Sequence, residues 1–179
     1  MAERVDSRTW TMRAVYIALA FVLIVVQLVP LDMRPAGWAG PDLLLAVTLV
    51  WIARRPVVVT APMVAGVFLM ADLFFMRPPG LWAALVVILT EMIRRRNSEF
   101  RNLPFVAEWG TIAGGIIMMT LLNLIILTLL AVPRASLGLT LMEMMMTILV
   151  YPPIVLLAYF FFGIGRPAPG ETGRKGQLL

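Results

Sequence analysis

Six long apolar runs, separated by short polar stretches, dominate this sequence. A helix crosses the hydrocarbon core of a bilayer with about 20 apolar residues, and about 17 to 25 is the working range. Of the 179 residues 61% are hydrophobic and 14% are charged, too few charges to cover a water-facing surface. We therefore predict an all-α, polytopic membrane protein built as a six-helix bundle. The runs are Met12–Val29, Leu43–Ala53, Val57–Met76, Leu81–Ile93, Trp109–Val132 and Leu139–Ile164.

The second and fourth runs are short, since a dozen helical residues reach only about 18 Å. They could be re-entrant segments, but the distribution of basic residues favours six spans. If every run crosses, 12 of the 15 basic residues lie on one side, together with both termini. The positive-inside rule places that side in the cytoplasm. The residues that set this topology are Arg54, Arg55, Arg94, Arg95 and Arg96.

No internal repeat divides the chain, so we expect one transmembrane domain over residues 1–165. Residues 166–179, RPAPGETGRKGQLL, form a Pro/Gly-rich polar segment that we predict to be a disordered cytoplasmic tail. The start of the chain loosely imitates a signal peptide. We favour a first span, because its apolar run is long enough to cross and two prolines would interrupt the cleavage region.

Two acidic residues lie inside apolar runs, where an ionisable group suggests a function by default. Asp72 is about four residues, roughly 6 Å of helix, from the outer end of the third run. Glu143 lies at a similar depth in the sixth. Asp72 either forms a buried ion pair or hydrogen bond that fixes helix packing, or serves a partner or ligand. Its candidate ion-pair partners are Arg34, Arg77 and Arg134.

Two further polar residues have simpler interpretations. Asn123 lies in the middle of the fifth run, where an amide usually bonds a neighbouring helix. Glu91 precedes Arg94 and Arg95 by three and four residues, so it can pair with either along one helix face.

Small residues spaced four apart predict close helix packing or a partner-binding surface. Gly110 and Gly114 form a GxxxG motif in the fifth run. Similar pairs occur in the first and third runs, at Ala14 and Ala18, and at Ala61 and Ala65 with Gly66 beside them.

The residue inventory argues against several classes of chemistry. Cysteine and histidine are absent, which removes the thiol nucleophile, the commonest general base and the strongest transition-metal ligands. No phosphate-binding loop, serine-hydrolase or zinc-protease motif occurs. The basic residues separate apolar runs and form no patch typical of nucleic-acid binding. We expect no catalytic residues, metal or cofactor, a non-enzymatic role, and no nucleic acid among the partners.

The order of several short motifs over roughly residues 10–165 resembles the MreD family, the polytopic component of the bacterial rod-shape machinery. These motifs are PDLLLAVTLVW at 41–51, RRP at 54–56, the G-x5-D spacing of Gly66 and Asp72, and the turn at Pro79 and Gly80. The resemblance implies a scaffold of the bacterial inner membrane that binds MreC and supports peptidoglycan synthesis. Its further partners would be RodA, the elongation penicillin-binding transpeptidase, MreB and membrane lipid.

The resemblance also implies a fold similar to the substrate-binding S-components of energy-coupling-factor vitamin transporters. An S-component is therefore the main alternative function, with Ala14 and Ala18 as the surface that docks a transporter scaffold. A small ion or proton carrier that uses Asp72 and Glu143 is less favoured, because no relay of polar groups continues inward from them.

Overall fold

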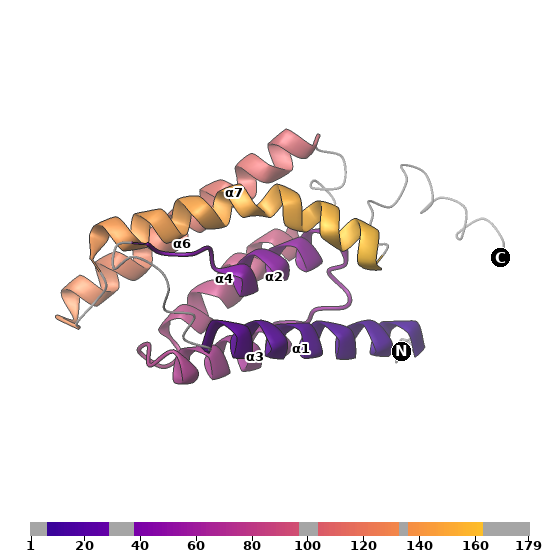
Figure 1. Cartoon of the computed structure of the whole chain (residues 1–179), viewed down its shortest axis with the longest axis horizontal. Coiled ribbons are helices and arrows are strands. Elements are labelled where there is room, and N and C mark those ends of the chain that lie inside the picture. Colours follow the sequence, from indigo (N-terminus) through magenta and orange to yellow (C-terminus); the bar gives the residue numbers. More distant parts are fainter. Residues whose placement is uncertain (1–6, 29–37, 97–103, 133–135, 163–179) are drawn as a thin grey trace.

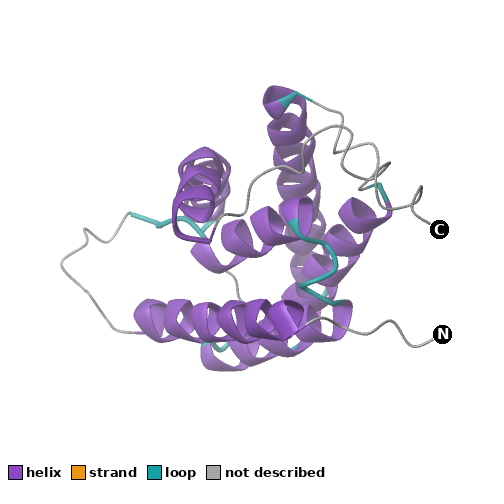
Figure 2. Ribbon diagram, turned by 90° about the vertical axis from the view of Figure 1, so that its right-hand side faces the viewer, coloured by secondary structure: helices purple, strands orange, loops and turns teal. Residues whose placement is uncertain are grey.

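The computed structural model describes residues 7–28, 38–96, 104–132 and 136–162, and within these ranges the regular structure is entirely helical (Figure 2). The prediction of an all-α fold is confirmed. The helices of the described ranges are α1 (Ser7–Leu28), α2 (Leu43–Arg54), α3 (Ala61–Phe74), α4 (Leu81–Arg95), α6 (Phe105–Leu129) and α7 (Leu137–Phe162). The predicted tail at 166–179 lies outside the described residues.

Successive helices alternate in direction, and the contacts at one end of the bundle show how. Arg13, near the start of α1, donates from Nε to the carbonyl of Val58 in the α2–α3 loop at 3.2 Å. Arg94, near the end of α4, donates to the carbonyl of Val59 in the same loop. Arg54, at the end of α2, pairs with Glu108 at the start of α6. We call this the arginine end; it faces right in Figure 1.

The opposite end holds the α3–α4 turn, and we call it the turn end. There Arg77 lies 4.0 Å from Asp42, which precedes α2, and 3.5 Å from Glu143, early in α7. The turn end therefore gathers the start of α2, the end of α3 and the start of α7 (Figure 1).

Helix α2 occupies the centre of the bundle, between α1 and α7 (Figure 1), and it also contacts α4. Eight of its 12 residues are buried, which accounts for a helix that is apolar on every side. The hydroxyls of Tyr16 in α1 and Thr48 in α2 share a 3.0 Å hydrogen bond, and both side chains are fully buried. A short α2 is thus accommodated by burial among longer helices.

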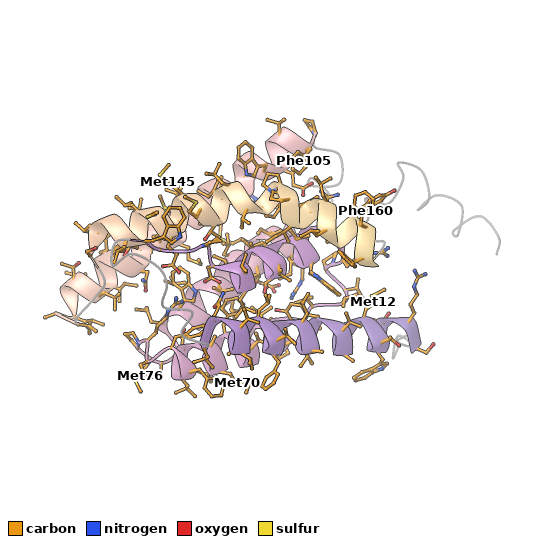
Figure 3. All side chains as sticks on the ribbon, viewed as in Figure 1. Met12, Met70, Met76, Phe105, Met145 and Phe160 are labelled. Carbon is orange, nitrogen blue, oxygen red and sulfur yellow. The ribbon has the colours of Figure 1, made fainter. Side chains whose placement is uncertain are left out.

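Helices α1, α6 and α7 are each long and apolar enough to cross a membrane, whereas α2 and α3 are shorter apolar helices. Large apolar side chains point away from the bundle: Met70, Met145 and Phe160 project outward in Figure 3 and are 47%, 59% and 78% exposed. Long apolar helices with an apolar exterior are characteristic of a membrane protein.

Several helix boundaries differ from the prediction: α1 begins at Ser7 and not Met12, and α6 at Phe105 and not Trp109, whereas α3 begins later than predicted. The third run was expected to be helical from Val57, but α3 begins at Ala61, and residues 57–60 form a turn. Their carbonyls accept hydrogen bonds from arginines of α1 and α4. Pro62 then occupies the first turn of α3, where its missing N–H costs nothing.

Helix α7 continues through Pro152 and Pro153. Proline has no backbone N–H, so Pro152 leaves the carbonyl of Ile148, four residues earlier, without its helical donor. The indole Nε1–H of Trp109 in α6 donates to this carbonyl at 3.0 Å. A side chain from a neighbouring helix therefore satisfies a backbone group that the proline frees, as tolerated prolines in membrane helices require.

Candidate functional site

Asp72 caps the helix that follows its own. It is fully buried near the end of α3, and its Oδ2 accepts from the backbone N–H groups of Gly80 at 3.0 Å and Ala83 at 3.2 Å. These are the N-cap and third positions of α4, whose first N–H groups have no partner within the helix. Gly80 has a φ of 86°, which favours glycine, and it offers no capping side chain. Asp72 supplies from another helix the cap that Gly80 lacks, and its charge suits a helix N-terminus.

The ion pairs expected for Asp72 are not found among the described residues, where no pair within 4.0 Å includes it. Arg77, one of its candidate partners, instead contacts Glu143 and Asp42. Arg34 and Arg134 lie outside the described residues. Of the contacts expected for a structural Asp72, the hydrogen bond is the one found among the described residues.

A cavity of about 250 Å³ lies at the turn end, between α2, α4, α6, α7 and the α3–α4 turn. It brings together Glu143 and Asn123, both predicted from the sequence, with Asp42 and Arg77. The other neutral polar and aromatic residues of its described lining are Thr120, Thr140, Thr147 and Trp82. We call this cavity the turn-end pocket. Asp72 does not line it, but its cap fixes the start of α4, from which Trp82 reaches the pocket.

Hydrogen bonds between helices hold the acidic side of the turn-end pocket in place. Asp42 caps α2, because its Oδ1 accepts from the N–H of Leu45 at 2.9 Å. The N–H of Asp42 donates to Oγ1 of Thr147 at 2.9 Å, and that hydroxyl donates to the carbonyl of Glu143 at 2.7 Å. The start of α2 is thereby tied to the turn of α7 that carries Glu143.

Among the described residues, Arg77 is the single basic residue that lines the turn-end pocket. Its guanidinium lies 5.4 Å from the ring centre of Phe75 and 5.6 Å from that of Trp82, distances typical of cation–π contacts. Its contacts with Glu143 at 3.5 Å and Asp42 at 4.0 Å are longer than the roughly 2.7–2.9 Å of a strong charged hydrogen bond. One cation is thus shared, at long distance, by two carboxylates.

A second ionic cluster lies at the arginine end and was not predicted. Arg54 Nη2 is 3.1 Å from Glu108 Oε1, and both side chains are buried. The hydroxyl of Tyr151 in α7 donates to the same oxygen at 3.0 Å. The sequence signal was weak, because Glu108 stands where a polar linker meets an apolar run, and its partners come from distant segments. At this end Glu91 also pairs with Arg94, at 2.7 Å, as their spacing suggests.

The glycines of α6 differ from the packing prediction. A Cβ placed at Gly110 or Gly114 would meet nothing within 4 Å, so neither residue makes a close helix contact within the described chain. The close approach is at Gly115, where a Cβ would lie 2.5 Å from Leu89 of α4. Because the GxxxG pair and Gly115 face different sides of the helix, only Gly115 faces a neighbour.

The other small residues are also largely open. Gly66 is exposed and a Cβ there would meet nothing within 4 Å. Ala14 and Ala18 are exposed on α1, and Ala61 and Ala65 are half-buried on α3. Of the remaining topology-setting residues, Arg55, Arg95 and Arg96 are exposed at the arginine end.

Comparisons with protein-family models, with curated proteins and with solved structures give no match. The site must therefore be interpreted from its own geometry and from the sequence motifs.

Proposed function

We propose that this chain is a non-enzymatic scaffold of the bacterial inner membrane, similar to MreD, which binds a single-span MreC-like protein through the exposed face of α6. In this proposal all six helices cross the membrane and both termini are cytoplasmic. The partner in turn connects the chain to the elongation enzymes, RodA and the penicillin-binding transpeptidase, and to MreB filaments that support peptidoglycan synthesis.

The alternation of the helices supports this topology. The arginine end collects Arg13, Arg54 and Arg94 from three helices, as expected for the cytoplasmic side of a six-span chain. The turn end would then face the outer side, where Asp72 fixes the α3–α4 turn. This is the region in which the G-x5-D and Pro-Gly motifs give the resemblance to MreD.

The observation that carries the proposal is the outward GxxxG face of α6. Gly110, Gly114 and Met118 follow one another at intervals of four, so they share one side of the helix. Space is open over both glycines, and Met118 is 60% exposed. Small residues at this spacing let two membrane helices approach closely, and no helix of the described chain packs against them. A single transmembrane helix is the partner that fits such a face.

Replacing the glycines tests the proposal in rod-shaped cells that depend on this chain. Gly110→Leu with Gly114→Leu should leave the isolated chain folded, since the space is open, but should block the close approach of a partner helix. Cells with this double variant should become round and should lose co-purification of a single-span partner. Gly138→Leu is the matched control, because Gly138 on α7 is equally open. Rod-shaped cells with an intact complex would reject the α6 interface.

The turn-end pocket favours a second candidate, an S-component of an uptake transporter. A pocket with several convergent polar groups is typical of small-molecule sites, and the exposed Ala14 and Ala18 could dock a transporter scaffold. Depletion distinguishes the two functions: a transporter subunit would produce a nutrient requirement in cells of normal shape.

A further inference from the structure

The turn-end pocket has a chemical character that the scaffold role does not require. We propose that it binds an organic ammonium group carried on a small apolar body, either a free primary amine or the headgroup of phosphatidylethanolamine. The inference does not depend on the α6 interface, so each can fail without the other.

Charge is the first argument. With the three ionisable side chains of its described lining charged, the pocket carries two negative charges, on Asp42 and Glu143, and one positive charge, on Arg77. Asp42 is 8% exposed. A carboxylate removed from water is costly unless a cation or hydrogen-bond donors compensate it. One further positive charge neutralises the described lining, whereas an anion would increase its excess of negative charge.

Unused hydrogen-bonding capacity is the second argument. Glu143 receives only the 3.5 Å contact from Arg77 among the described residues, and Asp42 Oδ2 receives only the 4.0 Å contact. An ammonium has three N–H donors in a compact group. It can therefore donate hydrogen bonds to both carboxylates and to a hydroxyl such as that of Thr140. Arg77, which is held over two aromatic rings, does not make this set of hydrogen bonds.

The rest of the lining suits an apolar body of limited size. Leucine, isoleucine and methionine side chains from α2, α4, α6 and α7 complete the wall, and at about 250 Å³ the space is smaller than the roughly 300–1,000 Å³ of drug-sized sites. Trp82 also contributes, because its Nε1–H is buried and has no acceptor among the described residues. That unused donor suits an uncharged oxygen of the ligand near the ammonium.

A matched series of ligands tests the proposal on the purified, delipidated full-length chain. Thermal unfolding is followed by intrinsic tryptophan fluorescence with n-hexylammonium, hexanoate or hexanol at equal concentration and ionic strength. A ligand that binds the folded state raises the melting temperature in a saturable way. We expect that rise with hexylammonium alone. Equal effects of all three, a larger effect of hexanoate, or no effect would overturn the proposal.

A variant locates the site. Glu143→Gln keeps the shape of the side chain and removes the excess negative charge, so hexylammonium binding should weaken about tenfold or more. Glu91→Gln, at the arginine end, is the control and should bind as the native chain does. Unchanged binding by Glu143→Gln would exclude this pocket. If that variant does not fold, the ligand series still decides whether the chain binds ammonium.

Nanodiscs then separate the two sources of the ammonium. In discs of phosphatidylethanolamine, the lipid headgroup should compete with hexylammonium, whereas phosphatidylcholine has no N–H to donate and should not. Competition by phosphatidylethanolamine alone assigns the site to a lipid, and no competition by either assigns it to a free amine. Equal competition by both lipids would contradict the role of the three N–H donors.

Discussion

The hydrogen bond from Trp109 to the carbonyl of Ile148 should contribute much less to the free energy of unfolding when Pro152 is replaced by alanine. In the native chain this bond, 3.0 Å long, serves a carbonyl that Pro152 deprives of its helical donor. Trp109→Phe leaves the carbonyl unsatisfied, which costs about 1–3 kcal/mol for a buried group. In the Pro152→Ala background, the N–H of the new alanine satisfies the same carbonyl, so this part of the cost disappears.

A double-mutant cycle measures that difference, because the packing lost when Trp109 becomes phenylalanine is common to both backgrounds. Measured hydrogen bonds between membrane helices average about 0.6 and reach about 1.7 kcal/mol. We therefore expect a coupling energy of about 1 kcal/mol from reversible unfolding of the four variants in mixed micelles. Pro153→Ala is the control, since Pro153 frees the carbonyl of Leu149, to which Trp109 does not donate. Coupling below about 0.3 kcal/mol with Pro152, or equal coupling with both prolines, would refute the argument.

Three further predictions concern the two ends of the bundle. Asp72→Ala should lower the free energy of unfolding by about 1–2 kcal/mol, because two amides of α4 lose their acceptor. Asp72→Asn should cost less than half as much, and equal losses for the two variants would argue against capping. Glu108→Leu should lower the free energy of unfolding by about 3–5 kcal/mol, because it leaves Arg54 buried without its carboxylate. Adding Arg54→Met should recover part of that loss, and additive losses in the same unfolding assay would argue against the ion pair. Cysteines at Ser98 and Ala36 should react with an impermeant maleimide from opposite sides of the membrane, and labelling of both from outside would refute the six-span topology.

The helices were largely predictable because their signals are local. An apolar run bounded by arginine or proline becomes a helix, and this held for each of the six runs. The start of α3 was misplaced because the apolar residues 57–59 lie in a turn, where arginines from two other helices bind their carbonyls. Hydropathy alone cannot distinguish an apolar turn from the start of a helix.

The partners of the polar residues were less predictable, because they depend on contacts between distant segments. Asp72 was identified as a special residue, but its cap on α4 requires the geometry of the turn at Gly80. Glu108 was overlooked, since only the packed bundle places it beside Arg54 and Tyr151. The turn-end pocket likewise exists only where five segments converge.

Photocrosslinking from the outward face of α6 tests directly whether a single-span partner binds there. A photoreactive residue at Met118, one turn beyond Gly114, should crosslink in living cells to a single-span protein that mass spectrometry identifies as MreC-like. The same residue at Leu73, exposed on α3, serves as the control. We expect a partner adduct from position 118 and none from position 73. A partner adduct from position 73 with only lipid adducts from position 118 would contradict it.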